Sequence, residues 1–216
     1  MGEVARPDRG ELTAATNPGP RDTAVVARPL LIAVIGKSAK DPSDPVPPEA
    51  LRTAEEVGRL IAESGAIVVS GGLSGVMEAV SRGAKSAGGL VIGLLPGFDK
   101  RDANAYVDIA ITTGMGWMRN TLTVRTADAV IMISGGIGTL NELTVAYQEK
   151  PTVILEGTGG WSDRIREIAY KGKHLDESRS AELHFARTPD EAVDLALRLA
   201  ADPTARAKSA ERELQS

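Results

Sequence analysis

The stretch AVIMISGGIGTLNE, residues 129–142, decides the fold of this 216-residue chain. Its first part, Ala129–Ile133, is apolar without alternation, which is typical of a parallel strand that is buried on both faces. The glycine-rich segment 135–138 predicts a tight turn, and the residues from there to about Glu149 predict a helix. Strand, glycine-rich turn and helix, in this order, form the repeating unit of an open α/β sheet.

The same unit recurs along the rest of the chain. Short apolar runs predict further strands at Leu30–Ile35, Ala66–Ser70, Leu90–Leu95, Val107–Thr112, Thr152–Glu156 and Leu183–Phe185. Helices are predicted between them, and the last opens with Thr188-Pro189-Asp190-Glu191, the pattern of a capping box with proline at the first helical position. We predict one three-layer α/β/α domain, residues 29–203, with a doubly wound, mostly parallel, Rossmann-like sheet. Residues 1–28 are expected to be disordered, and residues 204–216 to form a charged tail.

Composition excludes several classes of protein. The chain has no cysteine and two histidines, which excludes disulfides, thiolate zinc sites and a histidine-rich metal centre, so we predict no metal site. Its net charge is −4 and only 3% of its residues are aromatic, a balance that argues against a nucleic-acid partner. No apolar run approaches the length of a membrane span, and the first 28 residues lack the apolar core of a secretory signal. We therefore expect a cytoplasmic protein without a membrane partner.

Two glycine-rich turns carry the prediction of a ligand site. The turns Gly71–Gly75 and Gly135–Gly138 each link a strand to a helix at the edge of the sheet where ligands bind. Glycine lets the backbone approach a ligand, and a helix N-terminus offers free N–H groups to a phosphate. A lone turn of this kind is equally consistent with a tight turn and nothing more, but two at one edge favour an anion site. The candidate phosphate-binding residues are Ser38, Gly71, Gly72, Ser74, Gly75, Gly135, Gly136, Gly138 and Thr139.

Two standard phosphate-binding motifs are incomplete, because each lacks a required glycine or alanine at its expected position. Gly36-Lys37-Ser38 resembles the end of a P-loop, but Leu31 stands where the first glycine of that motif is required. Gly136-Ile137-Gly138 begins a dinucleotide-binding pattern, but Asn141 stands where its third glycine or alanine belongs. The sequence therefore supports neither a Walker-type nucleoside triphosphatase nor an ordinary NAD enzyme.

Glu142 and Arg119 each have two interpretations. Thr139-x-x-Glu142 has the spacing of a capping box, in which the carboxylate bonds back to the Thr139 N–H, and the spacing alone favours this structural role. Arg119 could be an exposed helix residue. However, it opens the helix after the fourth strand, and we expect this to place it at the same sheet edge as Glu142, one strand away. An arginine and a carboxylate beside a phosphate cradle could hold a nucleotide and act on its sugar.

The sequence resembles the LOG family at several independent points between about Leu30 and Pro151. Residues 134–142, SGGIGTLNE, are similar to the family's PGGxGTxxE motif, residues 70–77, SGGLSGVM, to its GGGxxGLM turn, and residues 90–96, LVIGLLP, to its GxVIGIxP strand. The resemblance implies a cytokinin-riboside-monophosphate type phosphoribohydrolase, not a lysine decarboxylase, with Arg119 and Glu142 as catalytic residues and with Arg125 in support. It also implies that no metal or organic cofactor is needed and that the protein is a homodimer or a higher assembly of dimers.

The chain departs from the LOG pattern at two positions of the site. Ser134 replaces the proline of the motif, and Asn120 replaces the lysine that follows the arginine. In the first turn, Ser70 stands in place of the first glycine; this turn, with the segments NAYVD at 104–108 and TGMG at 113–116, resembles a sister branch that includes the algal molybdenum-cofactor carrier protein. Two functions follow as expectations: hydrolysis of a nucleoside 5′-monophosphate to free base and ribose 5-phosphate, or binding and carriage of a phosphorylated nucleotide or pterin. A third, DNA handling as in distant DprA-like relatives, conflicts with the acidic balance.

Overall fold

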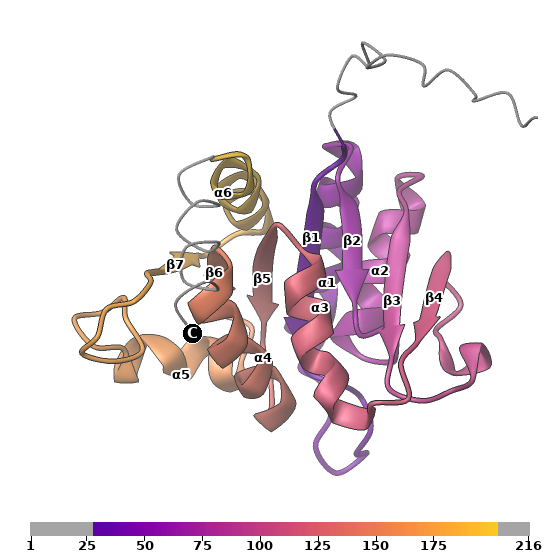
Figure 1. Cartoon of the computed structure of the whole chain (residues 1–216), viewed down its shortest axis with the longest axis horizontal. Coiled ribbons are helices and arrows are strands. Elements are labelled where there is room, and N and C mark those ends of the chain that lie inside the picture. The colour runs from indigo at the N-terminus through magenta and orange to yellow at the C-terminus, as the bar shows by residue number, and fades with distance from the viewer. Residues whose placement is uncertain (1–27, 203–216) are drawn as a thin grey trace, which may run out of the picture.

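A computed structural model describes residues 28–202, and its centre is a parallel sheet (Figure 1). Within these residues the sheet has seven strands in the order β4-β3-β2-β1-β5-β6-β7. The strands are β1 (Leu31–Gly36), β2 (Ile67–Ser70), β3 (Val91–Leu95), β4 (Ile109–Thr112), β5 (Ala129–Ile133), β6 (Thr152–Leu155) and β7 (Leu183–Ala186). All neighbouring pairs are parallel, which confirms the predicted sheet.

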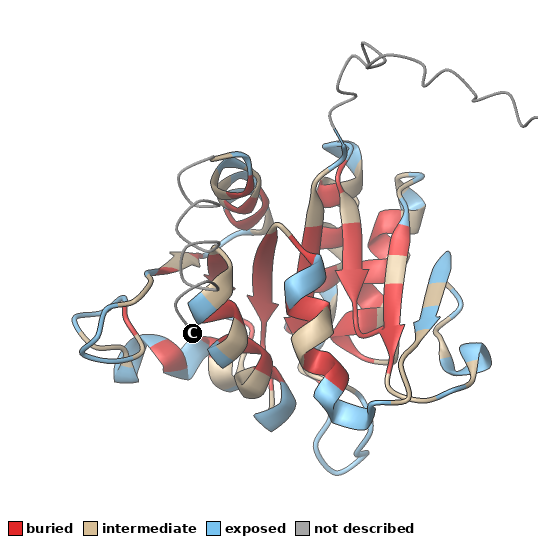
Figure 2. Cartoon of the chain, viewed as in Figure 1, coloured by how far each residue is buried: buried red, intermediate tan, exposed pale blue. Residues whose placement is uncertain are grey.

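Helices cover both faces of the sheet and complete three layers. The helices are α1 (Pro48–Glu63), α2 (Val76–Ser86), α3 (Asn120–Thr126), α4 (Ile137–Glu149), α5 (Gly160–Ile168) and α6 (Pro189–Ala201), with short 3₁₀ turns η1 (Lys100–Asp102) and η2 (Gly116–Arg119). Helices α1, α2 and α6 share one apolar core with the sheet, and α3, α4 and α5 share a second core on the opposite face (Figure 2).

Strand β1 shows why the central strands lack alternation. Ile32 and Val34 are fully buried in the core under α1 and α2, whereas Ala33 and Ile35 are buried in the core on the other face. Because both sides of each central strand are covered, apolar residues are favoured at every position. The prediction from unbroken apolar runs is therefore confirmed, with boundaries shifted by one or two residues.

The order of the strands creates a crevice between β1 and β5. From β1 the chain adds β2, β3 and β4 on one side, and it then returns across the sheet to place β5, β6 and β7 on the other. The connections after β1 and β5 therefore leave in opposite directions, and such a switch point is where ligands bind in sheets of this kind. The return crossing, through η2 and α3, brings Arg119 from the edge strand to the middle of the sheet.

Several smaller predictions can be compared with the described residues. The capping box of α6 is confirmed in part: Thr188 Oγ1 accepts the N–H of Glu191 at 3.2 Å, but the Glu191 carboxylate accepts the N–H of Arg187. The predicted disordered segment and charged tail lie outside the described residues, apart from Arg28. Among the helices of residues 28–202, none is long and apolar enough to cross a membrane.

Candidate functional site

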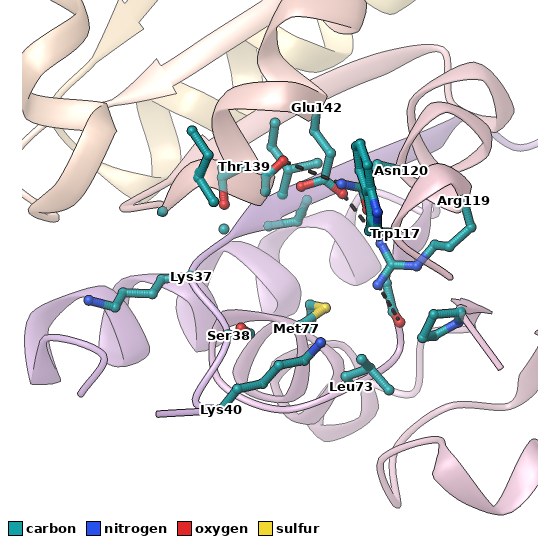
Figure 3. Close-up of a pocket in the computed structure, with 18 of the residues that line it drawn as sticks. Lys37, Ser38, Lys40, Leu73, Met77, Trp117, Arg119, Asn120, Thr139 and Glu142 are labelled. Carbon is teal, nitrogen blue, oxygen red and sulfur yellow. Dashed lines mark hydrogen bonds and ion pairs between the residues drawn. The ribbon is translucent and has the colours of Figure 1, made fainter. Parts of the chain in front are cut away.

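A cavity of about 290 Å³ lies at the switch point, above the C-terminal ends of β1 and β5 (Figure 3). Five segments line it: the end of β1 and the loop after it, the turn between β2 and α2, Pro96 after β3, the η2–α3 junction and the first turns of α4. Its polar lining residues are Lys37, Ser38, Lys40, Asp41, Asp44, Arg119, Asn120, Thr139 and Glu142.

The N-terminus of α4 supplies free backbone donors to this cavity. The N–H groups of Ile137, Gly138 and Thr139 donate no hydrogen bond to any other group in the described part of the chain, whereas Leu140 N–H bonds to Gly136 C=O at 3.0 Å. Such unpaired amides, together with the positive end of the helix dipole, attract an anion.

Hydrogen bonds from α5 hold the turn before α4 from behind. The C=O of Ser134 accepts the N–H of Ser162 at 3.1 Å and its Oγ at 2.9 Å, and the C=O of Gly135 accepts the N–H of Trp161 at 3.1 Å. On the same side, Ser134 N–H donates to Thr158 Oγ1 at 2.8 Å. The carbonyl groups of Ser134 and Gly135 are thus paired with α5, and the amides at the start of α4 remain available to a ligand.

Two glycines of this turn leave space that the fold does not need. A Cβ added at Gly136 would meet no atom of residues 28–202 within 4 Å, and one at Gly138 would meet only Asn120 Nδ2, at 4.0 Å. Neither residue has a positive φ, so the backbone conformation does not require glycine there. Both residues line the cavity. The remaining physical reason for glycine at these positions is close approach of a ligand to the backbone.

The predicted phosphate role of the Gly71–Gly75 turn is not supported by its geometry. The N–H of Val76, at the start of α2, donates to Lys37 C=O at 3.0 Å, and a Cβ at Gly75 would lie 2.5 Å from that carbonyl oxygen. The loop after β1 therefore occupies the space that an anion would need. Of the predicted residues in this turn, Gly71 lines the cavity, but Gly72, Ser74 and Gly75 do not. Gly135, before α4, also lies outside the lining. Ser38, after β1, and Thr139, in α4, are part of it.

Arg119 and Glu142 meet inside the cavity, and both are almost fully buried. Arg119 Nη1 lies 3.5 Å from Glu142 Oε1, with relative exposures of 6% and 7%. Arg119 Nη1 also donates to Asn120 Oδ1 at 2.7 Å, and Nη2 donates to Gly71 C=O at 3.3 Å. Its Nε has no hydrogen-bond partner among the described residues. The guanidinium is therefore held in place while it retains a free donor.

Two expectations about this pair are corrected. The capping-box interpretation of Glu142 is wrong, because α4 starts one turn earlier, with Gly136 as its N-cap and no side-chain cap, and the carboxylate instead faces Arg119. The expectation that Arg119 follows a strand next to that of Glu142 is also wrong: β4 and β5 lie four positions apart in the sheet, and the crossing through η2 brings the two residues together.

Burial shifts the ionisation of both groups. It raises the pKa of Glu142 to about 7, and the nearby positive charge of Arg119 opposes this shift. Burial also lowers the pKa of Arg119, against the effect of Glu142. A carboxyl group that titrates near neutral pH beside an arginine, in a cavity, has the properties expected of a functional group.

Arg125 does not belong to this site. It lies six residues after Arg119, about 9 Å further along the helix axis, and its guanidinium pairs with Glu149 at 2.6 Å, outside the cavity lining. Conversely, the predictions missed several lining residues, among them two lysines and a tryptophan. Lys37 and Lys40 add positive charge, although Lys37 pairs with Asp44. Trp117 is 70% exposed at the cavity. The Gly-Lys-Ser tripeptide at 36–38 was the available signal for Lys37.

Sheet order and cavity together define a Rossmann-like α/β protein with unpaired amides at a helix N-terminus and a buried arginine–glutamate pair at its switch point. A model of the SLOG cluster4 family matches residues 29–193, and the chain belongs to this family. This agrees with the resemblance to LOG proteins and their sister branch.

Curated relatives span both uncharacterised and enzymatic proteins. An uncharacterised protein of Archaeoglobus fulgidus is 47% identical over 117 residues, which cover 50% of this chain and 76% of the relative. The cytokinin riboside 5′-monophosphate phosphoribohydrolase of Mycobacterium tuberculosis is 33% identical over 144 residues, 59% of this chain and 77% of the relative.

Solved structures add proteins of the carrier type. The molybdenum cofactor binding protein of Rippkaea orientalis is 32% identical, with a TM-score of 0.67 over 80% of this chain and 98% of that one. The molybdenum cofactor carrier protein of Chlamydomonas reinhardtii is 30% identical, with a TM-score of 0.65 over 81% of this chain and all of that one (100%).

Proposed function

We propose that this protein binds a nucleoside 5′-monophosphate and hydrolyses its N-glycosidic bond. One observation carries the proposal: free amides and unfilled space at the start of α4 share a cavity with the buried Arg119–Glu142 pair. A phosphate on the amides would leave the sugar beside the pair. The phosphoribohydrolase relative supports this reading. No metal or organic cofactor is required for it.

The reaction places different demands on the two ends of the site. The 5′-phosphate is held by the amides of residues 137–139, with Thr139 Oγ1 and Lys40 in reach of the same cavity. Cleavage of the C1′–N bond develops positive charge on the ribose, which the ionised Glu142 carboxylate stabilises while it orients a water molecule. The water oxygen bonds to C1′, the bond electrons leave with the base, and a proton from the water ends on the base. Arg119 holds Glu142 in place beside the nucleotide.

A second function, carriage of a phosphorylated pterin or nucleotide without turnover, is favoured by the carrier-type structures. It uses the same cradle at α4, and the pair then serves only to bind. Purified protein should be incubated with nucleoside monophosphates, including AMP and isopentenyl-AMP, and free base measured by chromatography. Release of base supports the enzyme; tight binding with no release from any of the compounds supports the carrier.

Gly138→Ala should weaken binding of ribose 5-phosphate by at least about tenfold, a loss of about 1.4 kcal/mol. The added methyl group would project into the cavity, where the described chain offers no contact closer than 4.0 Å. In the first turn of a helix, alanine also stabilises by about 0.5–1 kcal/mol relative to glycine. Calorimetric titration and thermal unfolding should therefore show weaker binding in a protein of equal or higher stability.

Gly65→Ala is the matched control for this substitution. Gly65 follows α1 far from the cavity lining, and its positive φ of 78° makes alanine costly there. Gly65→Ala should lower the stability of the fold and leave the affinity for ribose 5-phosphate unchanged, the reverse of what is expected for Gly138→Ala. Unchanged affinity in Gly138→Ala would mean that the ligand does not approach α4, and it would remove the basis of the proposal.

We also propose that the protein forms a homodimer, or a higher assembly built from dimers, in the cytoplasm. Edge strand β4 pairs only with β3 in the described chain, and its sequence, IAIT, has no charged residue to discourage pairing. Ile109 and Ile111 are 48% and 43% exposed, and the neighbouring exposed apolar residues are Phe98, Met115 and Met118. A second copy placed across this open edge, around a two-fold axis, would cover them.

Ile111→Lys should reduce a dimer to the monomer and a higher assembly to a smaller one. A charge on an edge strand opposes pairing with another strand, because its amine would be desolvated in the interface. Light scattering after size-exclusion chromatography measures the mass, and Ile168→Lys, at a 63% exposed residue of α5, is the control. If the unmodified chain, Ile111→Lys and Ile168→Lys had equal masses, the β4 edge would be excluded as the dimer interface.

A further inference from the structure

Trp117 is placed and exposed in a way that the fold does not explain. The chain has two tryptophans. Trp161 is partly buried and packs against the core under α5, whereas Trp117 is 70% exposed and lines the cavity. An indole exposes a large apolar surface to water, which is unfavourable unless a partner covers it.

Contacts on both sides hold the short segment that carries this indole. Gly116 N–H donates to Pro96 C=O at 2.9 Å, which ties η2 to the end of β3. Two residues beyond Trp117, the Arg119 guanidinium is held by Gly71 and Asn120. Trp117 is therefore presented on a short segment that is anchored on both sides, so little conformational freedom is lost when a ligand stacks on it.

The cavity divides into an anion end and an apolar end. In Figure 3, Thr139 and Lys37 lie on one side, and Trp117 and Leu73 lie on the other, next to Arg119. Leu73 and Trp117 supply apolar lining at this second end, whereas Met77 lies near the middle of the view, with the Lys40 side chain between it and Leu73 (Figure 3). A ligand whose phosphate occupies the α4 amides would extend past Glu142 and Arg119 toward these residues.

We propose that the Trp117 indole is the stacking platform for the planar heterocycle of the ligand, so that the site selects phosphorylated compounds with a fused heteroaromatic ring over plain phosphosugars. The inference rests on the proposed function, since it requires the phosphate to bind at α4. Stacking recognises the face of the ring, not its edge groups, and therefore accepts a purine or a pterin alike.

Fluorescence of Trp117 tests the inference directly. In a Trp161→Phe background, which keeps the backbone N–H of residue 161, Trp117 is the only remaining indole. AMP or a phosphorylated pterin should quench its emission, and ribose 5-phosphate should bind without quenching. The relative affinities of AMP and the phosphorylated pterin then show which ring the site prefers.

Affinity measurements on Trp117 variants separate this platform from the phosphate site. Trp117→Ala should weaken AMP binding by about 5- to 150-fold, as expected for loss of one stacked base, and leave ribose 5-phosphate binding unchanged. Trp117→Phe should recover most of the AMP affinity. Because the side chain is exposed, neither variant threatens the fold.

Each contrary outcome identifies what failed. If Trp117→Ala leaves AMP affinity unchanged while ribose 5-phosphate still binds, the platform is excluded and the phosphate site stands. Equal losses for both compounds would make Trp117 a contact of the sugar phosphate. A changed molecular mass with unchanged AMP affinity would make it an interface residue. If neither compound binds to the unmodified chain, the proposed function and the platform both fail.

Discussion

Glu142→Gln is expected to lower the rate of base release from a nucleoside 5′-monophosphate by about 10²–10⁴-fold. The amide has the shape of the carboxyl group but carries no negative charge to stabilise the ribose cation. Ribose 5-phosphate should still bind, because the backbone amides at the start of α4 are unchanged. Chromatography of the released base and calorimetric titration of ribose 5-phosphate measure the two effects separately.

Glu149→Gln is the matched control on the same helix. Its carboxylate pairs with Arg125 outside the cavity lining, so this variant should release base at the unmodified rate. If Glu142→Gln were as active as the unmodified chain, another group would have to stabilise the transition state. If the unmodified chain bound nucleotides and released no base, Glu142 would act only in binding, as the carrier function requires.

The pH dependence of the reaction should report the ionisation of Glu142. Burial raises the pKa of this group to about 7, so its ionised fraction increases as the pH rises through that value. Because the ionised carboxylate stabilises the positive charge, kcat should increase with pH across this range and fall on the acid side. A rate that stays constant from acidic to neutral pH would separate Glu142 from the chemical step.

Ser134→Pro is expected to destabilise the fold by about 3 kcal/mol or more. Ser134 has a φ of +57°, whereas the proline ring locks φ near −65°. Proline would also remove the N–H that donates to Thr158 Oγ1. In a protein of this size the loss corresponds to roughly 6–12 °C in the midpoint of thermal unfolding, which calorimetry or circular dichroism can measure.

Ser134→Gly provides the opposite case at the same position. Glycine tolerates a positive φ, so it should remove about 1 kcal/mol of backbone strain. The Ser134 hydroxyl has no hydrogen-bond partner in the described chain, so its loss removes no bond. If Ser134→Pro were as stable as the unmodified chain, the turn would tolerate the conformation that the proline of the LOG motif requires. If Ser134→Pro is destabilised, the backbone of this turn has a conformation that the proline of the LOG motif cannot adopt.

Local patterns were sufficient for the elements and the family. Unbroken apolar runs located the strands, because a strand covered on both faces needs apolar residues at every position. The SGGIGTLNE motif identified the turn that leads into α4, and the structure places Gly136, Gly138, Thr139 and Glu142 in one cavity. Strands and turns of this kind depend on residues that are close together in the chain, so they can be predicted from a single sequence.

The tertiary structure alone decided which of these residues act together. Strand order depends on pairing between distant segments, so the sequence could not show that the crossing from β4 to β5 carries Arg119 to Glu142, nor that Arg125 ends outside the cavity. The role of the Gly71–Gly75 turn was decided in the same way, because the loop after β1 bonds to the start of α2. Trp117 could be recognised as a cavity residue only once its exposure was known, since exposure results from what the rest of the chain leaves uncovered.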